Sequence, residues 1–120
     1  MKKILLVDDE KEIRSLIRAT LGDQQYEFYE ATNGKEAVEK ALSVVPDLVL
    51  LDILMPVMDG HEACRKIRSD PSTRSVTVIM LTAKGQDEDI EKGKESGADD
   101  YLIKPFSPLD LLRKVEGCLK

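Results

Sequence analysis

Five side chains able to do polar chemistry follow directly after short apolar runs. They are Asp8 and Asp9 after residues 4–7, Asp52 in the apolar stretch 46–56, Thr82 after residues 76–81 and Lys104 after residues 101–103. Because parallel strands end at one edge of their sheet, where ligands bind, we expect these side chains to share one crevice. Each alone could simply cap a helix or turn, but five at one edge favour a functional site.

The charges of this crevice favour a divalent cation and a phosphoryl group. Three carboxylates repel one another, and Lys104 offsets only one of them. An all-oxygen site suits Mg²⁺ better than a softer metal, and the site could then accept a further anion. Thr82 and Lys104 could donate to phosphoryl oxygens while a carboxylate serves as the nucleophile.

Asp52 lies in the most apolar stretch of the chain, PDLVLLDILMP at residues 46–56. Such a run is typical of a strand buried on both faces of a parallel sheet. A carboxylate there is costly unless it meets a cation or hydrogen-bond donors. Capping of the next turn is the alternative role for Asp52.

The alternation of apolar runs with helical periodicity predicts an α/β fold. Strands are expected at residues 4–7, 26–30, 76–81 and 101–103 and within 46–56, each followed by a helix. Five such units imply right-handed crossovers and a doubly wound, five-stranded parallel sheet in the order 2-1-3-4-5, flavodoxin-like, with five helices. At this length the chain is expected to be a single domain, residues 1–120.

Three of the expected helices have informative sequences. The second should begin at Asn33 and Glu36 and bury Ala37, Ala41, Leu42 and Val45. The last should begin at Ser107, Pro108 and Asp110 and bury Leu109, Leu112, Val115 and Leu119. The helix at about residues 87–96 has one large apolar residue and an internal glycine, so it should be the least firmly held.

Composition excludes several classes of protein. The net charge is −5 and no long basic run is present, so direct nucleic-acid binding is not expected. No apolar stretch has membrane-spanning length and no signal peptide is recognisable, which favours a cytoplasmic protein. Cys64 and Cys118 lack metal-ligand spacing and are expected to be free thiols. His61 is expected to be a polar residue at a helix start.

Four sequence motifs resemble those of a bacterial two-component response-regulator receiver domain. They are VDDE at residues 7–10, LDILMPVMDG at 51–60, LTAK at 81–84 and GADDYLIKPF at 97–106. The resemblance implies that Asp52 accepts a phosphoryl group from a sensor histidine kinase or phosphotransfer protein. It implies that Mg²⁺ is bound by Asp9, Asp52 and the Leu54 backbone carbonyl, with Asp8 acting mainly through water, and that Thr82 and Lys104 bind the phosphoryl oxygens.

The same resemblance implies a conformational switch. Thr82 would move towards the phosphoryl group, and Tyr101 would rotate inward. The resemblance also implies that the Lys104-Pro105 peptide bond is cis. Leu54 and Lys84 would tune the lifetime of the phosphoryl group. The face formed by the fourth helix, fifth strand and fifth helix would then signal to an output domain or protein, or form a homodimer.

Two other classes of protein remain open. One is a Mg²⁺-dependent phosphohydrolase with Asp8 as nucleophile, although Glu10-Lys11-Glu12 fits its expected pattern poorly. The other is a receiver-like interaction module that is never phosphorylated. The presence of all five polar residues, Asp8, Asp9, Asp52, Thr82 and Lys104, argues against this alternative. The preferred hypothesis is a domain that phosphorylates and dephosphorylates itself without being a turnover enzyme. No glycine-rich nucleotide-binding turn follows the first strand.

Overall fold

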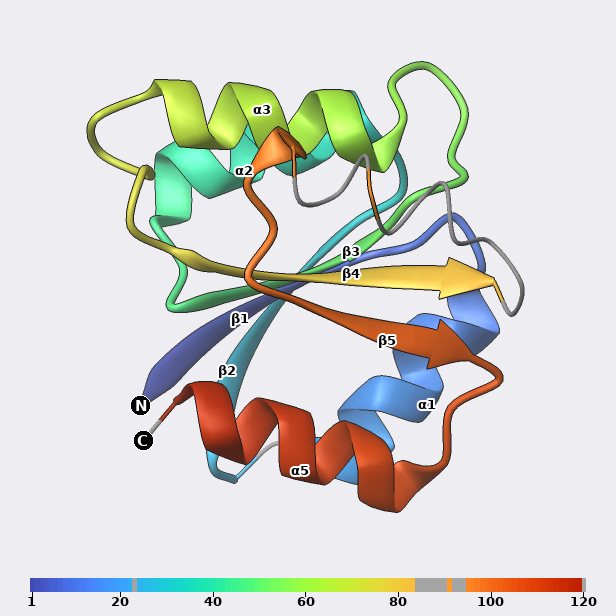
Figure 1. Cartoon of the computed structure of the whole chain (residues 1–120). Coiled ribbons are helices and arrows are strands. Elements are labelled where there is room, and N and C mark those ends of the chain that lie inside the picture. The colour runs from blue at the N-terminus through green and yellow to red at the C-terminus, as the bar shows by residue number, and fades with distance from the viewer. Residues whose placement is uncertain (23, 84–90, 92–94, 120) are drawn as a thin grey trace.

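The computed structural model describes residues 1–22, 24–83, 91 and 95–119 as a parallel sheet between two layers of helices (Figure 1). The strands are β1 (Lys2–Val7), β2 (Tyr26–Ala31), β3 (Leu48–Asp52), β4 (Thr77–Ala83) and β5 (Asp100–Lys104). The helices are α1 (Lys11–Leu21), α2 (Gly34–Val44), α3 (Gly60–Ser69) and α5 (Pro108–Cys118). Helices α2 and α3 cover one face of the sheet, and α1 and α5 cover the other.

The predicted doubly wound topology is confirmed. All neighbouring strands pair in parallel, in the order β2-β1-β3-β4-β5. The carboxyl ends of the strands therefore meet at one edge of the sheet, away from the two chain termini (Figure 1). The fourth predicted helix, at about residues 87–96, lies largely outside the described residues.

Strand β3 is buried along its whole length because both faces of the sheet are covered. Leu48 and Leu50 belong to the core against α1 and α5, whereas Val49 and Leu51 belong to the core against α2 and α3. This alternation follows from the two-residue period of a strand. A continuous apolar run was the correct signal for this central strand.

Two apolar residues expected in the core beneath α2 are exposed. Leu42 and Val45 are 41% and 44% exposed, so their predicted burial was wrong. The buried face of α2 runs through Ala37 and Ala41, and Leu42 is rotated about 100° from Ala41 on a helix of 3.6 residues per turn. Val45 lies past the last helical residue, in the left-handed conformation that ends α2.

The first turn of α5 contains an exposed apolar residue, and the first turn of α3 contains a buried polar one. Leu109 is 54% exposed, so its predicted burial was wrong, and the buried residues of α5 are Leu111 and Val115, one turn apart. Leu112 and Leu119 are partly buried against the same core. His61 lies at the start of α3, as expected, and is buried there. It is buried because the first turn of α3 lies against the end of β3, with the Gly60 amide donating to the Ile53 carbonyl at 3.0 Å.

The predicted caps of two helices are present, and both thiols are free. The Asn33 and Ser107 side chains cap α2 and α5 as predicted, accepting from the amides of Glu36 and Asp110. Cys64 is buried and both cysteines are free. No helix in the described part of the chain is long and apolar enough to cross a membrane.

Gly60 provides a test of how tightly α3 must approach the end of β3. A Cβ at Gly60 would overlap the Asp52 carbonyl oxygen and lie 2.9 Å from Ile53 Cα. We expect Gly60→Ala to reduce the free energy of unfolding by about 1–3 kcal/mol, the usual cost of overpacking. Urea unfolding midpoints measure the effect.

Gly117→Ala is the matched control. A Cβ there meets nothing within 4 Å on α5. This change should raise stability by about 0.5 kcal/mol, because alanine favours helix more than glycine does. Equal effects of the two substitutions would contradict the close contact at Gly60.

Candidate functional site

A pocket of about 290 Å³ opens at the carboxyl ends of β1, β3, β4 and β5. Its lining includes five of the residues predicted from sequence: Asp9, Asp52, Leu54, Thr82 and Lys104. Each lies at or near the carboxyl end of a strand, and the parallel topology brings these ends to one edge. Asp8 is buried next to this pocket and reaches it through Lys104.

Lys104 lies between two buried carboxylates. Its Nζ donates to Asp8 Oδ2 at 2.8 Å and lies 3.4 Å from Asp52 Oδ1. Burial alone would lower the pKa of the Lys104 ammonium, but the hydrogen bond to Asp8 and the negative charge of Asp52 outweigh it and raise that pKa. Lys104 therefore carries its positive charge at neutral pH.

Asp52 is the carboxylate with the clearest electrostatic perturbation. Burial, followed by the charge of Asp8, raises the pKa of Asp52 to about 6, against a partial offset from Lys104. The side chain is only 8% exposed. The carboxylates of Asp8 and Asp52 thus share one ammonium, that of Lys104.

Asp8 is held by four hydrogen bonds. Its amide donates to the Ala31 carbonyl at 3.2 Å, and its own carbonyl accepts from Arg14 at 2.8 Å. The Glu10 amide donates to Oδ1 at 2.9 Å, while Lys104 donates to Oδ2. Both carboxylate oxygens of Asp8 therefore already have a donor, whereas Asp9 next to it is exposed.

Glu10 is a site residue that the sequence prediction missed. The carboxylates of Asp8, Asp9 and Glu10 each place an oxygen within 4.8 Å of the others, and Glu10 also lines the pocket. Asp52 is not part of this closest group. The available signal was that Glu10 directly follows the two predicted aspartates. Carboxylate oxygens of this kind fit a hard cation such as Mg²⁺.

Thr82 and Tyr101 carry buried hydroxyl groups that lack a hydrogen-bond partner among the described residues. Thr82 is 2% exposed and lines the pocket, so its hydroxyl could donate to a bound anion. Leaving such a group unpaired costs free energy that a ligand would recover. The Tyr101 side chain is half-buried and packs on the core beneath α2 and α3.

Of the other predicted site residues, Leu54 lines the pocket and Pro105 lies outside it. Leu54 is 67% exposed at the mouth of the pocket. The Lys104-Pro105 bond is cis, as predicted from the family resemblance. Pro105 lies outside the pocket, in a neighbouring apolar groove with Phe106. Lys84 lies outside the described residues.

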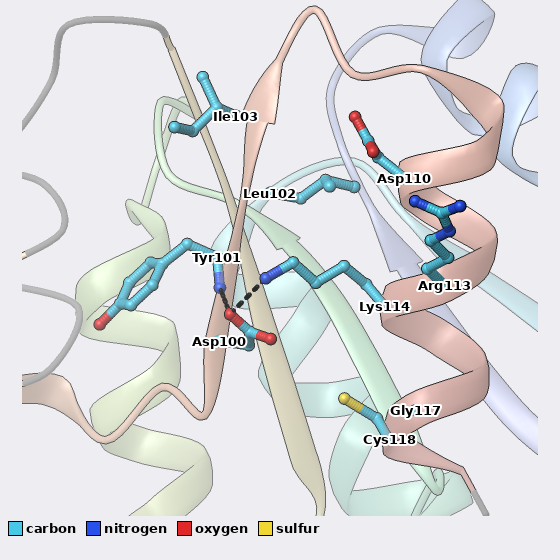
Figure 2. Close-up of a pocket in the computed structure, with 9 residues that line it drawn as sticks. All are labelled: Asp100, Tyr101, Leu102, Ile103, Asp110, Arg113, Lys114, Gly117 and Cys118. Carbon is cyan, nitrogen blue, oxygen red and sulfur yellow. Dashed lines mark hydrogen bonds and ion pairs between the residues drawn. The ribbon is translucent and has the colours of Figure 1, made fainter.

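A larger groove of about 670 Å³ lies between β5 and α5 (Figure 2). Lys114 of α5 donates to Asp100 Oδ1 at 2.8 Å across it. Figure 2 shows the Tyr101 ring pointing away from α5, so its backbone lies beside the groove while its ring packs on the opposite face. Strand β5 therefore connects the candidate site to this groove.

Comparison with known proteins agrees with the fold. The family model of the response regulator receiver domain matches residues 4–116. The chain therefore belongs to the response regulator receiver domain family, as its motifs predicted. It is 48% identical over 118 residues to transcriptional regulatory protein ResD of Bacillus subtilis and 43% identical to transcriptional regulatory protein SrrA of Staphylococcus aureus. These alignments cover 98% of this chain and 48% of each relative, so the chain spans about half their length.

Solved structures show the same fold. Chemotaxis response regulator CheY4 of Vibrio cholerae is 37% identical with a TM-score of 0.92, covering 99% of both chains. The receiver domain of sensor histidine kinase PA1611 from Pseudomonas aeruginosa is 35% identical with a TM-score of 0.88, covering 97% of this chain and 95% of that one. That structure has a magnesium ion coordinated in its active site cleft.

The raised pKa of Asp52 predicts how stability depends on pH in the absence of divalent cations. The folded chain binds the Asp52 proton more tightly than the unfolded chain, where the pKa is near 3.8. Stability should therefore fall as pH rises from about 4 to about 6 and then level off. Asp52→Asn removes this penalty, so the variant should exceed the wild type by up to about 3 kcal/mol at pH 7.5.

Urea unfolding in EDTA at pH 4 and pH 7.5 measures this difference. The advantage of Asp52→Asn should shrink to about 0.6 kcal/mol at pH 4, where Asp52 is protonated in the folded state and only partly ionised in the unfolded state. An advantage of the same size at both pH values would show that the burial of this charge is not its cause.

Proposed function

We propose that the chain is the phosphoacceptor of a two-component system and that Asp52 receives the phosphoryl group. The observation that carries the proposal is the position of Asp52, which is buried at the end of β3 within one pocket with Lys104 and Thr82. An ammonium and an unpaired hydroxyl beside a carboxylate suit the binding of phosphoryl oxygens. Residues 1–120 would form one receiver domain.

The proposed reaction is nucleophilic transfer. An Asp52 carboxylate oxygen forms a bond to phosphorus as the bond from phosphorus to the donor imidazole nitrogen breaks. The imidazole leaves after taking up a proton, and Asp52 becomes an acyl phosphate. Lys104 and Thr82 would hold the phosphoryl oxygens in place, so the residues act by positioning and charge stabilisation.

The charge of the pocket supports a requirement for Mg²⁺. Asp9, Asp52 and the Leu54 backbone carbonyl would hold the ion, with Asp8 acting mainly through water because both its oxygens already accept hydrogen bonds. When bound, Mg²⁺ neutralises charge on the transferring phosphoryl group. The PA1611 receiver domain, which binds magnesium in its cleft, supports this assignment.

Phosphorylation of Asp52 would change the conformation of Thr82 on β4 and Tyr101 on β5. It adds about −1.5 to −2 charge at Asp52, and Thr82 would turn its unpaired hydroxyl towards that charge. The space left would allow Tyr101 to rotate further inward. The face that includes β5, α5 and their groove would then engage an output domain or form a homodimer. Leu54 and Lys84 would tune the lifetime of the phosphoryl group.

The partners follow from this role. The phosphoryl donor would be a sensor histidine kinase or a phosphotransfer protein, and the downstream partner would be an output domain or protein. The names of ResD and SrrA describe transcriptional regulation, which supports a regulatory output.

Asp52→Asn should abolish covalent labelling by acetyl phosphate in the presence of Mg²⁺, because the nucleophilic oxygen is lost. Intact-mass spectrometry measures the added phosphoryl group, and EDTA should prevent labelling of the wild type. Asp110→Asn, in the first turn of α5, is the control and should be labelled like the wild type.

Labelling of Asp52→Asn at an unchanged rate would overturn the assignment. Continuous turnover of a phosphomonoester by the wild type, lost in Asp8→Asn, would instead favour a phosphohydrolase. A wild-type chain that folds, binds Mg²⁺ and never becomes labelled would favour an interaction module.

A further inference from the structure

Arg14 of α1 connects the acidic turn after β1 to the neighbouring strand β2. Its Nη1 donates to the Asp8 backbone carbonyl at 2.8 Å, and its Nε donates to Glu30 Oε1 at 2.8 Å. Its own amide donates to the Glu10 carbonyl at 3.3 Å. One residue thus contacts both ends of the Asp8–Glu10 turn and fixes it to β2.

The contact with the Asp8 carbonyl bears on Asp9. That carbonyl belongs to the peptide plane between Asp8 and Asp9, so holding it restricts the backbone from which the Asp9 side chain leaves. Asp9 is exposed, and its carboxylate accepts no described hydrogen bond. The orientation of Asp9 therefore depends on the backbone that Arg14 holds.

The guanidinium is well ordered by its surroundings. The Arg14 side chain is 13% exposed, compared with 40% for Arg18 one helical turn later. Glu30 would have a raised pKa from burial alone, but its hydrogen bonds to Arg14 and Arg18 lower that pKa. Glu30 therefore stays ionised and keeps Arg14 in place.

We propose that Arg14, oriented by Glu30, is a positioning residue that sets the Asp8–Glu10 turn in the geometry that binds Mg²⁺. This rests on the proposed function, which places a Mg²⁺ site at these acids. Groups that orient metal ligands contribute strongly to metal affinity, and their loss typically weakens it about 10–100-fold.

Charge and positioning make opposite predictions for Arg14. A guanidinium near a cation site repels the cation, so removing it should strengthen Mg²⁺ binding if charge alone matters. Removing it should weaken binding if Arg14 orients the ligands. The sign of the effect therefore separates the two roles.

Arg14→Met and Arg18→Met form a matched pair. Both remove one positive charge from α1 and one hydrogen bond to Glu30, since Arg18 donates to Glu30 Oε2 at 3.0 Å and lies over the Phe28 ring. Isothermal titration with MgCl₂ measures the dissociation constant of the unphosphorylated chain. We expect Arg14→Met to weaken binding at least about tenfold, and Arg18→Met to leave it unchanged or up to about twofold tighter.

Two further variants keep the test valid if Arg14→Met folds poorly, as judged by circular dichroism. Arg14→Lys keeps the charge but replaces the planar fork that spans Glu30 and the Asp8 carbonyl, so Mg²⁺ binding should weaken by an intermediate factor. Glu30→Gln keeps Arg14 but removes its charged partner, and should also weaken Mg²⁺ binding.

Unchanged or tighter Mg²⁺ binding by folded Arg14→Met would overturn the positioning role of Arg14 but not the metal site. The same result for both single variants, Arg14→Lys and Glu30→Gln, would have the same meaning. Absence of Mg²⁺ binding by the wild type would instead overturn the proposed metal site, so the two failures are distinguishable.

Discussion

The site depends on the ammonium of Lys104, which lies between two buried carboxylates. It contacts Asp8 Oδ2 at 2.8 Å and approaches Asp52 Oδ1 to 3.4 Å, linking β5 to β1 and β3. One cation cannot neutralise two buried anions with the exposed Asp9 beside them, so an excess of negative charge remains. Burial of the Asp52 carboxylate, together with the charge of Asp8, raises the pKa of Asp52 to about 6. A divalent cation would relieve it, and this links the fold physically to the proposed phosphoryl chemistry.

The parallel sheet creates this arrangement from residues far apart in the sequence. Its covered faces bury β3 completely, so the carboxylate of Asp52 emerges into a largely desolvated pocket. Each helix layer then adds one constraint at the carboxyl ends of the strands. On one side α3 approaches closely enough to exclude a Cβ at Gly60. On the other side α1 supplies Arg14, which fixes the turn that carries Asp9.

The predictable part of the structure was the part set by local periodicity and topology. Strand ends located the polar residues of the pocket, because the order of a doubly wound sheet brings its carboxyl ends together. Exposure of Leu42 and Leu109 was not predictable from apolarity alone, since it depends on the exact rotation of each helix on the sheet. The role of Arg14 was also hidden, because an arginine on a polar helix face does not reveal which distant carbonyl it contacts.

Proton release on Mg²⁺ binding tests most directly whether excess buried charge defines the site. Calorimetric titrations in two buffers of different ionisation enthalpy measure the protons released per ion bound. With the pKa of Asp52 near 6, the wild type should release about half a proton at pH 6 and almost none at pH 8. Asp52→Asn should release almost none at either pH. Binding by the wild type without proton release at pH 6, or equal release from Asp52→Asn, would contradict the account.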